Sequence, residues 1–122
     1  MKALLSIKPE FANMIFVGIK KYEFRRAIFK RHITKVIVYA SSPVKMVIGE
    51  FEVEEIIFHD IKTLWKMTKL SAGIDEKYFK KYFKNKEKGY AIKIKNYKKY
   101  KIPLCLKDEF GLTPPQSFSY LK

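Results

Sequence analysis

The residues best suited to chemistry lie in one segment, residues 18–26, with the sequence GIKKYEFRR. In this segment one carboxylate, Glu23, lies among four cationic side chains, Lys20, Lys21, Arg25 and Arg26. Arginine can hold a phosphate through two parallel hydrogen bonds, and lysine supplies a compact positive charge. The segment therefore predicts an anion-binding site. Three roles stay open for the carboxylate: it can pair with Arg25 or Lys21, orient a hydroxyl or amine of a ligand, or act as a base.

The pattern G-x-K-x-x-E-x-R within this segment resembles the signature of the ASCH domain (activating signal cointegrator homology), a relative of the PUA RNA-binding fold. Residues 4–9, 39–44 and 114–118 also resemble family segments, so the resemblance covers most of the chain. It implies an α+β fold, namely a PUA-like small mixed β-barrel with about three flanking helices. It also implies a cleft that takes RNA, another nucleic acid or a nucleotide.

Other segments supply further residues to such a cleft. Lys8 lies at the junction of an expected strand and helix, and Gln116 can present both a donor and an acceptor to a base. Phe118 can stack on a base, or it can pack in the core as part of a C-terminal strap. The expected nucleic-acid-binding residues are Lys8, Lys20, Glu23, Arg25, Arg26, Ser41, Ser42, Gln116, Ser117 and Phe118.

The leading function is thus an RNA-binding module, and a hydrolase acting on RNA or a modified nucleoside is the alternative. Some ASCH-like proteins are ribonucleases, and others are amidohydrolases that act on N4-acetylcytidine with a lysine, a threonine and a glutamate. Lys20 matches that lysine, whereas Glu23 stands where the amidohydrolases have threonine. If the chain is an enzyme, Lys20 and Glu23 are its expected catalytic residues. A lysine base needs a lowered pKa, which cationic neighbours favour.

The charge balance supports an anionic partner independently of the resemblance. The chain has 26 basic and 12 acidic residues and a formal net charge of +14, which attracts polyanions. A heat-adapted, lysine-rich protein would look similar, and a regulatory module that binds a small anionic metabolite is a third interpretation. Two lysine-rich surfaces, at residues 77–84 and 97–101, either follow a phosphate backbone or are simply solvated.

Length and composition predict one domain over residues 1–122, with enough apolar residues for a core. His32, His59 and Cys105 are the only histidines and cysteine, and their spacing gives no metal site, so neither a metal nor a cofactor is expected. A single cysteine and the lack of a signal-peptide pattern or a long apolar run favour a cytoplasmic protein without membrane contact. The oligomeric state stays open.

Periodicity gives the expected elements. Strands are expected at residues 3–7, 35–40, 45–58 and 90–95, with an edge strand at 103–106, and helices at residues 9–17, at 60–70 and after Asp75. The signature segment itself reads as a strand in which Tyr22 and Phe24 share one face and Glu23 and Arg25 the other. Burying the aromatic pair would turn Glu23 and Arg25 toward a cleft or solvent. Lys20 joins them only from a turn before the strand or beside a bulge.

Overall fold

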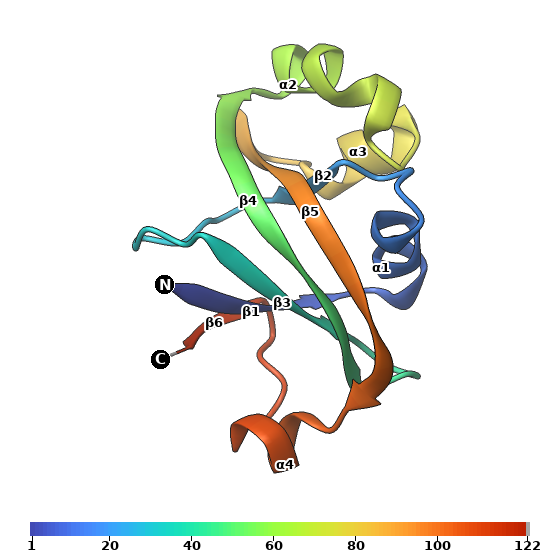
Figure 1. Ribbon diagram of the computed structural model, residues 1–122. Coiled ribbons are helices and arrows are strands. Elements are labelled where there is room, and N and C mark those ends of the chain that lie inside the picture. Colours follow the sequence, from blue (N-terminus) through green and yellow to red (C-terminus); the bar gives the residue numbers. More distant parts are fainter. Residues whose placement is uncertain (122) are drawn as a thin grey trace.

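Six strands pair into one mixed sheet, with helices at its ends and beside it (Figure 1). The computed structural model describes residues 1–121. The strands are β1 (Lys2–Ile7), β2 (Tyr22–Arg25), β3 (Lys35–Ala40), β4 (Met46–Asp60), β5 (Lys88–Leu104) and β6 (Phe118–Leu121). The helices are α1 (Pro9–Phe16), α2 (Ile61–Thr68), α3 (Glu76–Tyr82) and α4 (Leu106–Phe110), with a short 3₁₀ turn at Lys69–Ser71. The predicted α+β class is confirmed.

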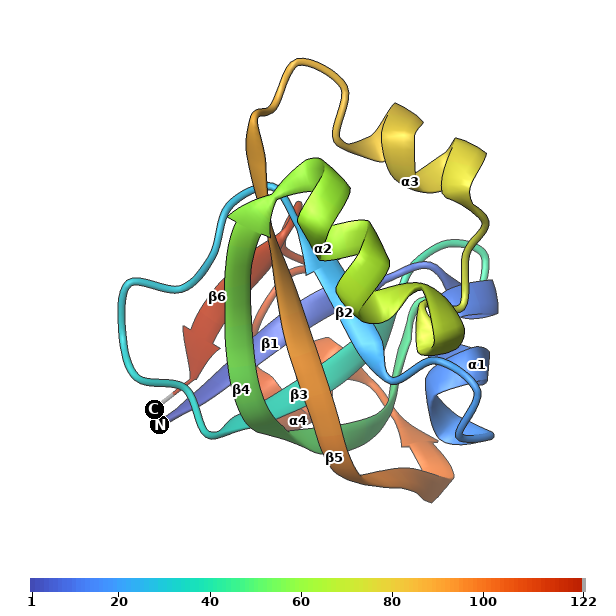
Figure 2. The ribbon, with the colours of Figure 1, turned by 90° about the horizontal axis from the view of Figure 1, so that it is seen from above.

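The strand order is β2-β5-β4-β3-β1-β6, in which β1 and β3 are parallel and all other neighbours are antiparallel. The long strands β4 and β5 cross the shorter β1 and β3 at a large angle, so the sheet is strongly twisted (Figure 2). At Gly49 on β4, the ring of Phe16 and the carbonyl of Lys98 occupy the space that a Cβ would need. A glycine there lets α1 pack closely on the sheet.

Closure of the sheet into a barrel is not confirmed. The strand order ends at β2 and β6, and within residues 1–121 no backbone ladder joins these two strands. The edges nevertheless approach each other, since Arg25 on β2 donates a hydrogen bond to Ser117 Oγ, directly before β6, at 3.2 Å. Side chains rather than backbone hydrogen bonds therefore connect the two edges of the sheet.

Three hydrophobic clusters hold these elements in place. The largest fills the space between the sheet and α1 and includes Leu5, Ile15 and Phe51, all fully buried. A second lies under α2 and α3, where Phe24 of β2 meets Phe79 with ring centroids 5.1 Å apart. The third lies under α4. The second cluster is important for the site because it fixes β2 against α3.

The first three helices begin where the sequence predicts, and residues at their N-termini explain why. Pro9 is the first residue of α1, where its missing N–H is not needed. Asp60 caps α2, since its Oδ2 accepts from the backbone N–H of Thr63 at 2.9 Å. Asp75 caps α3 in the same way, accepting from the N–H of Tyr78 at 2.8 Å.

The C-terminal part of the chain differs from the prediction. The expected edge strand at residues 103–106 is only partly confirmed: Pro103 and Leu104 are the last residues of β5 rather than a separate strand, and Leu106 begins α4. Leu106 is buried in the third cluster with Leu4, and Gly111 at φ +66° ends the helix. Residues 1–121 thus form four α-helices rather than about three, and the tail adds β6 beside β1. Within residues 1–121 no helix is long and apolar enough to cross a membrane.

The cap of α2 gives a pH-dependent stability. Hydrogen bonds from Thr63 lower the pKa of Asp60 from 3.8 to about 2. Because the folded-state pKa is depressed, this stabilisation is complete above the unfolded value and is lost as pH falls from about 4 to 2. Asparagine also caps helices but carries no charge. We expect the gap in unfolding free energy between wild type and Asp60→Asn to be constant above pH 4 and to shrink toward pH 2 in urea titrations. A gap that does not change over this range would contradict the assignment.

Candidate functional site

A cavity of about 390 Å³ opens where the ends of β1, β2 and β3 meet α1, α3 and the segment before β6. Cations, aromatic rings and small polar groups share its wall. The lining residues are Ser6, Ile7, Lys8, Phe11, Lys20, Glu23, Phe24, Arg25, Ser41, Ile74, Tyr78, Tyr82, Gln116 and Ser117. Three cations face one carboxylate, so the cavity attracts anions.

Lys20 lies in the turn between α1 and β2, which is one of the two positions that its inclusion with Glu23 and Arg25 allowed. Its backbone N–H donates to the carbonyl of Met14 at 3.1 Å, which fixes the turn to the end of α1. The side chain is only 3% exposed, and Nζ donates to the carbonyl of Ala72 at 2.7 Å. Nζ also lies 4.9 Å from the ring centroid of Phe24. The ammonium is thus held at a fixed point of the cavity wall.

The stem of Lys20 packs directly on Gly73. This glycine has φ +71°, and a Cβ at its position would collide with the Cβ and Cγ of Lys20. A glycine is therefore needed both for the turn and for close packing on the lysine. The segment containing Ala72 and Gly73 positions Lys20 from two sides, since the carbonyl of Ala72 accepts a hydrogen bond from Nζ and Gly73 leaves room for the stem.

Burial lowers the pKa of Lys20 below its usual value of 10.5. The charge of Glu23 acts in the opposite direction and raises this pKa, while the charge of Arg25 lowers it further. Desolvation has the largest effect because few water molecules reach the ammonium. The neutral amine, which can accept a proton, is therefore more populated than for an exposed lysine.

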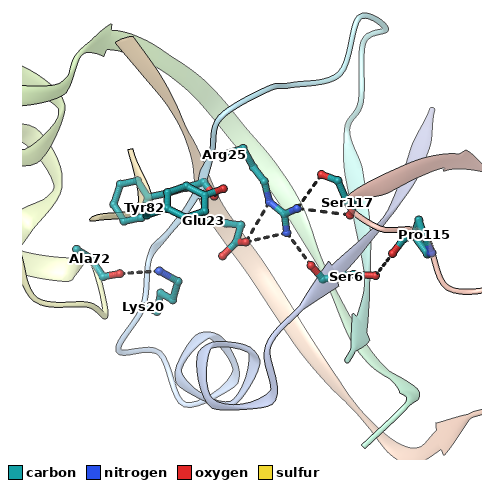
Figure 3. A network of polar contacts seen from close by, with 9 residues as sticks. Ser6, Lys20, Glu23, Arg25, Ala72, Tyr82, Pro115 and Ser117 are labelled. Atoms are coloured by element: carbon teal, nitrogen blue, oxygen red, sulfur yellow. Dashed lines mark hydrogen bonds and ion pairs between the residues drawn. The ribbon is translucent and has the colours of Figure 1, made fainter. Parts of the chain in front are cut away.

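Arg25 and Glu23 form a buried ion pair, with 8% and 7% of their surface exposed (Figure 3). Arg25 Nη2 and Nε donate to Glu23 Oε2 at 2.9 and 3.2 Å. Nη2 also donates to the Ser6 carbonyl at 2.8 Å, and Nη1 donates to Ser117 Oγ and the Ser117 carbonyl at 3.2 and 3.4 Å. A guanidinium has five N–H donors, and these five bonds use them all. Arg25 therefore positions Glu23 and Ser117 rather than offering a free donor to a phosphate.

The cavity brings together most of the residues predicted from sequence. Seven of the ten expected binding residues line it: Lys8, Lys20, Glu23, Arg25, Ser41, Gln116 and Ser117. Lys8 is exposed at the rim, where Nζ donates to the hydroxyl of Tyr78 at 3.2 Å. The paired role for Glu23 is observed, with Arg25 rather than Lys21 as the partner.

The other three expected residues do not line the cavity. Arg26 donates from Nη1 to the carbonyls of Tyr82 and Lys84 at 2.8 and 2.9 Å, which caps the end of α3. Phe118 packs edge-on against Phe29, with centroids 5.0 Å apart, as the alternative of a C-terminal strap anticipated. Ser42 is exposed in the turn after β3.

The aromatic wall of the cavity is what the sequence analysis missed. Tyr78 and Tyr82 are four residues apart and therefore share one face of α3, and Phe11 faces them from α1. The spacing was visible, but it equally suits a buried helix face. Tyr82 donates its hydroxyl to the carbonyl of Phe24 at 3.0 Å, and burial raises its pKa. In the described part of the chain, no cluster of three or more His, Cys, Asp or Glu side chains could hold a metal ion.

A family model for the ASCH domain matches residues 5–98, which include the signature strand and most of the sheet. The chain belongs to the ASCH domain family. This ASCH domain is 33% identical to a Zymomonas mobilis protein named ASCH domain-containing ribonuclease, over 99% of this chain and 84% of the relative. A crystal structure of the Zymomonas mobilis ASCH protein matches with a TM-score of 0.91 at 34% identity, covering 99% of this chain and 87% of that chain.

Two further proteins also match most of this chain. The ASCH domain is 31% identical to the large ribosomal subunit protein uL22 of Ureaplasma parvum, over 98% of this chain and 39% of the relative. The N-terminal domain of McrB from Staphylothermus marinus matches with a TM-score of 0.50 at 17% identity, over 88% of this chain and 80% of that one. At that identity the likeness concerns the fold alone.

The buried ion pair makes a stability prediction. Replacing Arg25 by alanine leaves Glu23 buried without its bonded cation, which is expected to lower the free energy of unfolding by about 3–5 kcal/mol. The double variant Glu23→Leu/Arg25→Leu should recover part of this loss because no isolated charge is left. Arg26→Ala is the control: it removes two surface hydrogen bonds and should cost about 1 kcal/mol. Equal losses for Arg25→Ala and Arg26→Ala in urea denaturation would contradict the central role of Arg25.

Proposed function

We propose that this ASCH domain binds single-stranded RNA and takes one unstacked nucleotide into the cavity at the signature strand. The observation that carries the proposal is the combination of buried cations and aromatic rings in a space of about 390 Å³. Cavities of roughly 300–1,000 Å³ are typical of small-ligand sites, and a single nucleotide fits within that range. RNA-binding proteins commonly recognise bases that have left the stack.

The aromatic wall supports a base as the ligand. Phe11 and Tyr78 lie edge to face, with centroids 5.3 Å apart, and Tyr82 lies four residues further along α3. Stacking of a base on an aromatic side chain contributes about 1–3 kcal/mol. Gln116 and Ser41 lie on the polar side of the same cavity and can bond to a base edge or a sugar hydroxyl.

The cations support a phosphate beside that base. The Lys20 ammonium has three N–H donors, and the bond to the Ala72 carbonyl uses one of them. Lys8 adds a second ammonium at the exposed rim. Arg25 acts indirectly, because it holds Glu23 and Ser117 where they can orient a ribose hydroxyl. A 2′-hydroxyl is the group by which such a site tells RNA from DNA.

The net charge of +14 supplies the remaining affinity through release of counterions from the nucleic acid. That contribution depends strongly on salt and little on sequence, so it adds to binding at the cavity without replacing it. The Zymomonas mobilis relative is named a ribonuclease, which supports RNA as the ligand class.

The binding proposal is tested with a matched pair of charge-removing variants. Lys20→Met keeps the packed stem but removes the ammonium, whereas Lys66→Met removes an exposed charge on α2, outside the cavity. Loss of a charge-assisted hydrogen bond costs about 1.5–3 kcal/mol, so Lys20→Met should weaken single-stranded RNA binding roughly tenfold or more. Lys66→Met should have little effect in the same fluorescence-anisotropy titration.

Duplex RNA and single-stranded DNA serve as comparison ligands at matched salt. We expect both to bind more weakly than single-stranded RNA, since one lacks unstacked bases and the other lacks the 2′-hydroxyl. Equal affinity of both lysine variants for RNA would reduce the interaction to attraction by surface charge, and the proposal would fail.

RNA cleavage is the second candidate function, and the buried amine of Lys20 favours it. A lysine with a lowered pKa can take the proton of a 2′-hydroxyl. The 2′-oxygen then bonds to the adjacent phosphorus, and the bond from phosphorus to the 5′-oxygen breaks. The leaving 5′-oxygen takes a proton from water, and the hydroxide that remains takes the proton back from the Lys20 ammonium. The products are a 2′,3′-cyclic phosphate and a 5′-hydroxyl.

The sign of the pH dependence follows from this role. Only the neutral amine accepts a proton, so the single-turnover rate at saturating RNA should rise with pH and level off at the lowered pKa, below 10.5. Lys20→Arg should keep binding and lose cleavage, because arginine does not deprotonate in proteins. Cleavage that persists unchanged in Lys20→Arg would exclude Lys20 as the base.

A further inference from the structure

We propose that a second cavity on this domain binds the adjoining nucleotides of the same RNA strand, with Phe58 and Tyr90 as its stacking platform. The inference rests on the proposed function, because it extends the RNA strand beyond the nucleotide in the first cavity. The second cavity has a volume of about 640 Å³. Its lining residues are Arg26, Ala27, Ile28, Phe29, Lys30, Phe58, Lys86, Glu87, Lys88 and Tyr90.

Two stacked aromatic rings are part of the lining of this cavity. Phe58 and Tyr90 are direct neighbours on β4 and β5, and their rings are stacked with centroids 4.4 Å apart and planes at 25°. Phe58 is 49% exposed, so a large apolar ring faces solvent beside the cavity. An exposed aromatic ring among charged groups is what a base needs for stacking.

The charges around the rings favour a polyanion. Four cations line the cavity against one carboxylate: Arg26, Lys30, Lys86 and Lys88 against Glu87. The Nζ of Lys88 lies 5.5 Å from the ring centroid of Phe58, so cation and ring form one surface. Arg26 is held by the carbonyls at the end of α3, which fixes its position at the cavity wall. Alternating cations and aromatic faces match the phosphates and bases of a single strand.

The two cavities lie along one row of the sheet. Arg25 on β2 is directly opposite Tyr90 on β5, and Tyr90 is directly opposite Phe58 on β4. Directly opposite residues of adjacent antiparallel strands share a face, so this row leads from the wall of the first cavity to the platform of the second. Arg26 follows Arg25 in the chain and lines the second cavity. A strand that leaves the first cavity along this row meets the platform next.

The experiment measures affinity as a function of RNA length. Oligoadenylates from the mononucleotide to about eight residues are titrated by fluorescence competition, with the RNA checked for integrity afterwards. The wild type should gain affinity as the oligomer becomes long enough to reach Phe58. Phe58→Ala should weaken binding of the longer oligomers about tenfold, which corresponds to the loss of one stacked base. It should leave the affinity for the mononucleotide unchanged.

A pair of double variants separates position from total charge. Lys86→Ala/Lys88→Ala removes two cations of the second cavity, and Lys66→Ala/Lys69→Ala removes two exposed cations from α2 and the following turn. The first should reduce the length-dependent gain, and the second should not. This pair also tests the proposal if Phe58→Ala does not fold, as judged by circular dichroism.

The outcomes distinguish the two proposals. Both proposals are supported if Lys20→Met lowers the affinity at every oligomer length and Phe58→Ala loses the gain in affinity with length. Unchanged length dependence in Phe58→Ala and in Lys86→Ala/Lys88→Ala overturns the second cavity while leaving the first intact. No mononucleotide binding and no effect of Lys20→Met, with Phe58→Ala still weakening long oligomers, would overturn the first cavity as the RNA site and leave the platform as an independent one.

Discussion

The guanidinium of Arg25 connects parts of the domain that the backbone leaves unpaired. β2 and β6 are the two ends of the strand order, and Arg25 reaches from β2 to the Ser6 carbonyl on β1 and to Ser117 before β6. A backbone ladder there would fill the gap between the edges, and no cavity would form. A side-chain link holds the edges together and leaves a space beside it. The site thus exists because the two edges of this open sheet are linked by an arginine side chain rather than by another row of backbone hydrogen bonds.

Burying charged side chains at the sheet edges has an electrostatic cost, and this cost affects which ligands the site favours. Burying Arg25 and Glu23 removes two charges from water, and they are tolerated because they bond to each other and to nearby polar groups. Lys20 is buried in the same region without a carboxylate bonded to Nζ, and desolvation lowers its pKa. A ligand with a negative charge beside Nζ would offset part of the desolvation cost of the Lys20 ammonium. Burial therefore gives Lys20 a stronger preference for an adjacent anion than an exposed lysine has.

Local features of the fold could be predicted from sequence, and features that depend on distant partners could not. The strand at residues 35–40 and the helix starts at Pro9, Asp60 and Asp75 follow from side chains near each element. In contrast, β6 forms only because β1 offers it an edge, and α4 forms where Leu106 reaches the core. The tail residues 103–121 therefore carried the main errors.

The same distinction explains what was predictable in the site. Parity along the signature strand placed Glu23 and Arg25 together. It required Lys20 to lie in the preceding turn or beside a bulge, and the structure has it in the turn. The use of all five donors of Arg25 depends on serines far away in the chain, so the sequence could not separate a positioning role from a phosphate contact. Likewise, Tyr78 and Tyr82 have the spacing of an ordinary buried helix face. Their part in the cavity follows only from the packing of α3 opposite α1.

The division between buried and exposed cations also determines how such a domain would discriminate among ligands. Exposed lysines attract any nucleic acid, and salt largely screens that attraction beyond about 10 Å. Lys20 acts in a cavity of lower dielectric, where an interaction with a well-placed anion is stronger and less screened. In the proposed function, the surface charge would therefore speed and strengthen encounter with the RNA, whereas selection of the ligand would fall to the few buried groups. One of those groups, Arg25, also links the sheet edges, so its position in the cavity depends on the fold as a whole.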